Sequence, residues 1–117
     1  MRIDIKTLCG IHAVTASDGE KVLLRIKPQI ESGESVTLDF TGVDIVNITF
    51  FNSALTPLLE LRAVDEVKEI LKIVHLPSKT LEDLPVAVLD KAWRMKTDPE
   101  YRQKVNEGVA SSMRGGQ

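Results

Sequence analysis

The stretch SVTLDFTGVDIVNITFFNSAL, residues 35–55, predicts a buried strand that passes through a tight turn into a helix. Val36, Leu38 and Phe40 have the apolar and aromatic character of a strand, and Thr41-Gly42 interrupts the pattern. Apolar side chains then return at helical spacing, at Phe50, Phe51, Ala54 and Leu55. A strand that leads through a turn into a helix is typical of an α/β domain.

The residues before this stretch continue the alternation of strands and helices. Residues 2–7 alternate apolar and polar side chains, which predicts a strand near a sheet edge, and residues 11–14 are the candidate for an extra strand. Ser17 followed by Glu20 predicts a capped helix start, and Gly33 predicts the end of that helix. The apolar face of the helix consists of Val22, Leu23, Ile26 and Ile30.

The residues after it extend the same order. The pattern predicts a helix over 49–61, a short helix over 65–70, a strand over 71–76 and a helix over 80–95. A terminal helix is expected to open at Asp98-Pro99, and residues 111–117 are expected to form a flexible tail. We therefore expect one α/β domain over residues 1–110, with a mixed or mostly parallel sheet of about four strands and helices mainly on one face.

Residues 38–43, Leu-Asp-Phe-Thr-Gly-Val, resemble the strand half of the central motif of STAS domains. In that motif the strand is followed by Asp-Ser-Ser-Gly-Leu at a helix start. Laid on this frame, Asn47 takes the place of the Asp, Ile48 of the first Ser, and Thr49 of the phosphorylated second Ser. Asn47 lacks the carboxylate of the motif, and Phe50 stands where the motif has Gly.

The chain is also similar to divergent STAS-like domains of unknown function, which are related to anti-sigma factor antagonists. Residues 17–20, Ser-Asp-Gly-Glu, resemble the opening of the first helix in those domains, and the whole resemblance covers residues 2–76. It implies a single STAS-like domain that acts as a non-enzymatic regulatory module. It also implies a protein partner, either an anti-sigma factor or an ATPase of the histidine-kinase-like fold.

The polar group at the start of the 49–61 helix is open to two interpretations. The hydroxyl of Thr49 or the amide of Asn47 can cap the helix, or Thr49 can be a phospho-acceptor whose added charge disrupts a docked partner. Candidate partner contacts are Asn47, Phe50, Phe51 and Ser53, with the alternative that the two phenylalanines belong to the core. Asp39 and Gly42 are interpreted as residues that stabilise the turn after the strand.

Composition argues against several functional classes. The 117 residues are 43% hydrophobic and 27% charged, which suits one globular core, and no apolar run reaches the roughly 20 residues of a membrane span. A net charge of -2 and 4% aromatic residues do not favour nucleic-acid binding. The sequence has one cysteine, Cys9, and two histidines, which do not make up the ligand set of a typical zinc site. It has no Gly-rich phosphate loop. We expect a cytoplasmic protein without metal, cofactor or catalytic residues.

Two alternatives to a regulatory module remain open. Helix N-termini at the carboxyl ends of parallel strands commonly bind anions, so a small-ligand or nucleotide-binding domain is one alternative. The other is an accessory subunit that forms a homo-oligomer through the apolar residues 55–61.

Overall fold

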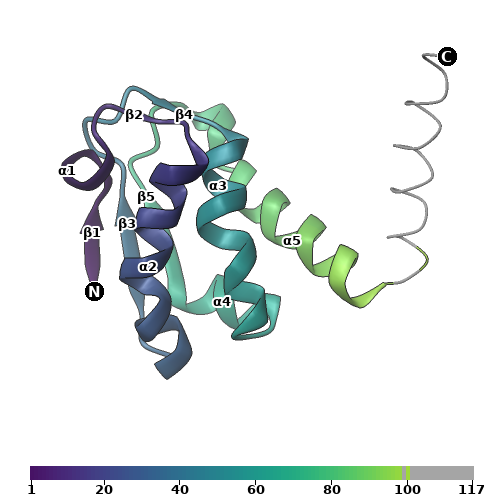
Figure 1. The fold of residues 1–117 in the computed structure, drawn as a ribbon. Coiled ribbons are helices and arrows are strands. Elements are labelled where there is room, and N and C mark those ends of the chain that lie inside the picture. Colours follow the sequence, from purple (N-terminus) through teal and green to yellow (C-terminus); the bar gives the residue numbers. More distant parts are fainter. Residues whose placement is uncertain (99, 101–117) are drawn as a thin grey trace, which may run out of the picture.

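Strands and helices alternate along the chain (Figure 1). The computed structural model describes residues 1–98 and 100. The strands are β1 (Arg2–Asp4), β2 (His12–Ala13), β3 (Val36–Asp39), β4 (Ile45–Val46) and β5 (Leu71–Val74). The helices are α1 (Ile5–Cys9), α2 (Ala16–Ser32), α3 (Ile48–Leu55), α4 (Val64–Ile70) and α5 (Leu84–Thr97), with 3-10 turns η1 (Thr56–Glu60) and η2 (Lys79–Leu81). The expected helix at Asp98-Pro99, the domain limit at residue 110 and the 111–117 tail lie outside the described residues.

The strands form two parallel sheets. In the larger sheet β3 lies between β1 and β5, and Leu38 is in register with Ile3 on one side and Ile73 on the other. The smaller sheet pairs β2 with β4, with Ala13 opposite Val46. The α/β class, the parallel pairing and the edge position of β1 are therefore confirmed. The predicted four-stranded sheet is divided, because the turn after β3 carries the chain beyond the main sheet before β4 meets β2 (Figure 1).

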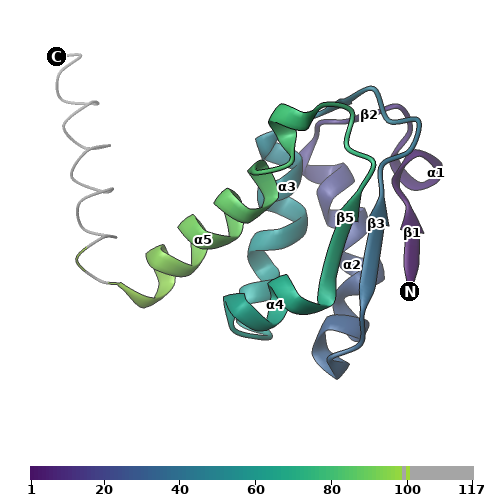
Figure 2. The same cartoon turned by 180° about the vertical axis from the view of Figure 1, so that it is seen from behind.

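Helices cover one face of the three-stranded sheet. Figures 1 and 2 show α2 and α3 on the same side of β3, and no described helix lies across the other side. Arg2, Thr37 and Lys72 share one register row on this uncovered face, and Arg2 and Lys72 are exposed there. The prediction of helices mainly on one face is confirmed.

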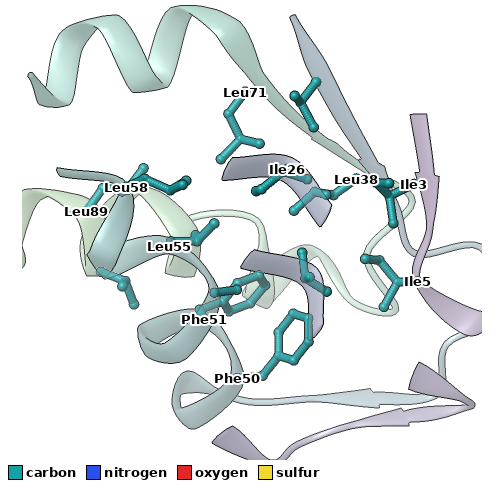
Figure 3. Close-up of a cluster of buried hydrophobic side chains, with 14 of the residues drawn as sticks. Ile3, Ile5, Ile26, Leu38, Phe50, Phe51, Leu55, Leu58, Leu71 and Leu89 are labelled. Atoms are coloured by element: carbon teal, nitrogen blue, oxygen red, sulfur yellow. The ribbon is translucent and has the colours of Figure 1, made fainter. Parts of the chain in front are cut away.

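Side chains from the covered face of the sheet, α2 and α3 form a single core (Figure 3). Three aromatic rings join the end of β3 to the start of α3, with centroids 5.6 to 5.9 Å apart. They belong to Phe40, Phe50 and Phe51, and all three are fully buried. Because burying such a side chain is worth about 1.5–3 kcal/mol, this aromatic cluster is a major source of stability.

The helices α2 and α3 meet with their backbones in contact at Gly19. A Cβ atom at this position would lie 2.6 Å from the carbonyl oxygen of Phe50 and 2.6 Å from the Cβ of Ser53. Both distances are far below van der Waals contact, and neither atom lies at the end of a flexible side chain. The close packing of α2 against α3 therefore requires glycine at this position.

The predicted strand over residues 2–7 is too long. The strand ends at Asp4, whose Oδ1 accepts a hydrogen bond from the Thr7 N–H at 3.2 Å and so caps α1. Ile5, which the alternation placed in the strand, is fully buried as the first residue of this helix. A capped helical turn satisfies the same burial pattern as the alternation, so the period-2 pattern was misleading at this point.

The start of α2 also differs from the prediction. Thr15 is the N-cap, and its hydroxyl accepts a hydrogen bond from the Asp18 N–H at 3.0 Å. Ser17, the predicted cap, lies inside the first turn, because the helix starts two residues earlier than the Ser17-Glu20 spacing suggests. The predicted end is confirmed, since Gly33 has the left-handed conformation, with φ 75°, that glycine adopts without strain.

The predicted helix over 49–61 is two elements. The α-helix α3 ends at Leu55, and the chain continues as the 3-10 turn η1 with Pro57 near its start. Proline has no N–H to donate and its ring crowds the carbonyl four residues earlier, so it stops the α-helical ladder. The elements predicted after it are confirmed in type as α4, β5 and α5, and Pro85 lies in the first turn of α5 as expected.

The Gly19 contact makes a testable prediction. Gly19→Ala is expected to lower the free energy of unfolding by about 1–3 kcal/mol, because overpacking against the α3 backbone outweighs the better helix propensity of alanine. Urea denaturation measures the change, and Glu20→Ala, at the exposed neighbouring position of the same helix, is the matched control. An alanine variant as stable as the parent protein would contradict the backbone contact.

Candidate functional site

The start of α3 lies at the edge of the domain where the parallel strands end (Figure 1). Asn47 has extended backbone geometry, and its side-chain oxygen accepts a hydrogen bond from the Phe50 N–H at 3.1 Å. Asparagine is among the preferred N-cap residues because its short side chain reaches an N–H that the helix leaves unpaired. Asn47 is therefore the cap of α3.

Thr49 lies in the first turn of α3 and is exposed. Its hydroxyl forms no hydrogen bond with any described residue. Of the two capping groups considered from the sequence, the Asn47 amide fills the role and the Thr49 hydroxyl does not. The hydroxyl therefore faces solvent without a structural task.

Three predicted partner contacts have structural roles instead. Phe50 and Phe51 are fully buried and point into the core (Figure 3), so the prediction that their rings contact a partner is wrong. The Ser53 hydroxyl donates a hydrogen bond of 2.6 Å to the Ala16 carbonyl and so links α3 to the first turn of α2. These residues hold α3 against the domain.

Three isoleucines in α3 and in the segments that precede it are exposed. Ile11, Ile45 and Ile48 have exposed fractions of 50%, 47% and 50%. The Ile11 carbonyl accepts hydrogen bonds from the N–H groups of Asp44 and Ile45 at 2.8 and 3.2 Å, which brings the first two together. The sequence offered one sign of this surface, since Ile48 replaces a serine of the STAS motif.

A groove of about 370 Å³ lies between α3 and α5. Ile48 and Asn52 line it from α3, and most of the α5 lining is apolar. The residues that α5 contributes are Leu84, Ala87, Val88, Lys91, Ala92 and Met95. Ile48 therefore belongs both to the exposed isoleucines and to the groove lining, and Thr49 follows it directly in the first turn of α3.

A second polar group stabilises the turn after β3, as predicted for Asp39 and Gly42. The Asp39 carboxylate accepts hydrogen bonds from the Thr41 hydroxyl at 2.6 Å, the Thr41 N–H at 2.9 Å and the Arg2 guanidinium at 2.8 Å. The Thr41 bonds first, and then Arg2, lower the pKa of Asp39 from 3.8 to about 2. Gly42 has φ 81°, which the turn requires.

The remaining Cys, His, Asp and Glu side chains of the described residues do not gather into a metal site. Cys9 is half-buried, its thiol donates to the Asp18 carbonyl at 3.6 Å, and burial, followed by the Asp18 charge, raises the pKa of the thiol. Among residues 1–98 and 100, no three His, Cys, Asp or Glu side chains lie close enough to hold a metal ion. A helix with the length and apolarity of a membrane span is likewise missing from this part of the chain.

Comparison with known protein families identifies a family for this chain. The family described as STAS-like domain of unknown function (DUF4325) matches residues 18–80, just over half of the chain. The matched part runs from the first turn of α2 through β3, the start of α3 and β5. None of the curated proteins or solved structures matches the chain.

Capping of α3 by Asn47 alone yields a paired prediction. Asn47→Ala is expected to lower the free energy of unfolding by about 1 kcal/mol through loss of the cap. Thr49→Ala is expected to change it by less than about 0.5 kcal/mol, because an exposed hydroxyl without a partner contributes little. Chemical denaturation of both variants tests the assignment, and a larger loss for Thr49→Ala would reverse it.

The Asp39 hydrogen bonds predict a pH dependence. The folded-state pKa of about 2 lies below the ordinary 3.8, so the ionised carboxylate stabilises the fold above about pH 4 and this contribution is lost as the pH falls toward 2. A carboxyl ¹³C NMR titration is expected to find Asp39 ionised at pH 3. Thr41→Val removes the hydroxyl and should raise the pKa of Asp39, and an unchanged pKa in that variant would show that the hydroxyl is not the cause of the shift.

Proposed function

This chain belongs to the family of STAS-like domains of unknown function, and on that premise we propose that it is a non-enzymatic regulatory module that binds a partner protein through the start of α3. The proposal rests chiefly on the exposed Thr49 hydroxyl, which serves no described contact and stands beside Ile48 and the groove between α3 and α5. An apolar surface next to a modifiable hydroxyl suits binding that can be switched off.

Phosphorylation of Thr49 is the switch that we propose. A phosphate adds a charge of about -1.5 to -2, which the N-terminal end of a helix tolerates because the unpaired N–H groups there favour anions. The same charge opposes a docked apolar surface through desolvation. The bulky neighbour Phe50 is no obstacle, since its ring is fully buried in the core whereas Thr49 is exposed.

The partner that we propose is an anti-sigma factor or an ATPase of the histidine-kinase-like fold, in keeping with the STAS resemblance. Ile11, Ile45 and Ile48 would contact the partner in place of the two phenylalanines. Exposed aliphatic side chains surrounded by polar ones are typical of the core of an interface. The Asn47 side chain, which is engaged in the cap, would act by fixing the orientation of the helix.

The oligomeric alternative has weaker support than it had from the sequence. Leu55, Leu58 and Leu59, which were to form the interface between copies, are 0 to 3% exposed within one chain. The apolar content of this segment is therefore accounted for by the core. Binding of a small ligand or nucleotide remains a prediction from the fold class.

The proposal can be tested with a photo-crosslinking amino acid placed at Ile48 in cells, with Leu24 as the matched position. Both side chains are exposed, 50% at Ile48 and 72% at Leu24, and Leu24 lies on α2 away from α3. We expect a crosslink from residue 48 to an ATPase of the proposed fold or to an anti-sigma factor, and none from residue 24. Equal crosslinking from both positions to unrelated proteins would argue against a specific surface.

The switch is tested with the purified partner. Thr49→Glu is expected to weaken binding by about tenfold or more, equivalent to about 1.4 kcal/mol, while Thr49→Ala keeps the affinity and removes phosphorylation at this site. Isothermal titration calorimetry measures both variants, and mass spectrometry locates the phosphate after incubation with ATP and the partner. Unchanged affinity of the glutamate variant would exclude Thr49 from the interface.

A further inference from the structure

The outer edge of β5 has unpaired backbone groups. The Phe40 N–H donates to the Val74 carbonyl at 3.0 Å, so the backbone polar groups of Val74 face β3. Hydrogen bonding in a parallel strand alternates from residue to residue, so the N–H and C=O of Ile73 face away from the sheet. The His75 N–H faces the same way, because it belongs to the planar peptide group whose Val74 carbonyl points to β3. β5 ends at Val74 and His75 has φ 60°, so the extended edge does not continue beyond this N–H. No described residue donates to or accepts from these two backbones. The edge thus offers N–H and C=O groups spaced for another strand.

A cavity of about 390 Å³ lies beside this edge, between β5, α4 and the start of α5. Figure 2 shows β5 at the side of the sheet that faces α5. The apolar part of its lining consists of Leu71, Ile73 and Leu76 from the strand and the residues that follow it, and of Pro85, Val86 and Leu89 from α5. The polar part consists of Lys68, His75 and Glu82. Its volume suits one or two apolar side chains, and Val86 at its wall is 45% exposed.

The charge on the opposite face of the strand is positive. Lys72 is exposed on the uncovered face of the sheet and has no carboxylate partner among the described residues. The neighbouring cations differ, since Arg2 is paired with Asp39, and Lys68 is paired with Asp90. An acidic side chain on a strand added at this edge would lie across from Lys72.

We propose that the outer edge of β5 binds an extended segment of a partner protein as an added strand, with apolar side chains in the cavity and acidic side chains opposite Lys72. Main-chain hydrogen bonds to Ile73 and His75 would supply affinity, and the alternation of the two side-chain types would supply specificity. This surface shares no residue with the start of α3, so the proposal stands independently of the function proposed above.

A second copy of this chain is the less favoured occupant. Pairing of two β5 edges would bring Lys72 of each copy onto the same narrow ribbon without a facing carboxylate, and like charges across a strand pair are destabilising. A lysine on an edge strand is a common device against pairing of identical edges. With an acidic partner segment, the same lysine would instead face a carboxylate across the strand pair, which is a favourable contact.

Selection of phage-displayed random octapeptides against the full chain tests the proposal. The selected peptides are expected to alternate apolar and acidic residues, and fluorescence polarisation then measures the affinity of the best one. Val86→Glu and Lys72→Glu should each weaken its binding at least tenfold, whereas Leu24→Glu, the same substitution at an exposed site on α2, should leave it unchanged. Circular dichroism confirms that each variant is folded.

A peptide-side control removes any dependence on protein folding. N-methylation of the peptide amides that face β5 should abolish binding, while N-methylation on the other edge should preserve it, because only one edge donates to the sheet. Hydrogen exchange should slow at Ile73 and His75 in the complex. The proposal is overturned if no peptide is enriched, if Val86→Glu binds as well as the parent, if methylation of the β5-facing amides is tolerated as well as methylation of the other edge, or if the protein instead dimerises through β5.

Discussion

The contact among Phe40, Phe50 and Phe51 determines how the rest of the domain is arranged. Phe40 follows the central strand, and the other two belong to the first turn of α3, so their mutual burial fixes the start of that helix against the sheet. Since successive side chains on a helix point about 100° apart, burying Phe50 and Phe51 directs Thr49 outward. The backbone contact at Gly19 then brings α2 against the same turn. Core packing therefore decides which polar groups reach the surface.

The sequence predicted the α/β class, the parallel strands and the covered face because these depend on period and on residue type. It was less accurate where two local signals competed. The alternation of residues 2–7 favoured a longer strand over a helix capped by Asp4. The Ser17-Glu20 spacing favoured Ser17 over Thr15 as the cap of α2. Pro57 was expected inside a helix, but a missing N–H and a steric clash were enough to change α3 into η1. The boundaries of the helices thus depended on single hydrogen bonds, and the residue pattern alone did not predict which of two possible caps would form.

The candidate site was predicted in part. The position of the polar group at the start of α3 followed from the turn after β3 and from the STAS resemblance, and Asp39 stabilises its turn as expected. The exposure of each residue could not be obtained in this way, because it depends on segments distant in sequence. Ile11 and Ile45 meet only through the β2–β4 pair, and the groove exists only because α5 packs beside α3. The sequence alone does not distinguish a buried apolar residue from an exposed one.

The separation of the cap from the neighbouring hydroxyl has a thermodynamic consequence. Because the cap of α3 is the Asn47 side chain and not the Thr49 hydroxyl, a modification of Thr49 does not remove the cap. In the switch proposed above, the added charge would therefore act mainly on the complex with the partner. Coupling between two equilibria is reciprocal. A partner that loses affinity when Thr49 is modified must disfavour that modification by the same factor while it is bound. At equilibrium, more free partner would then mean a smaller modified fraction of the protein.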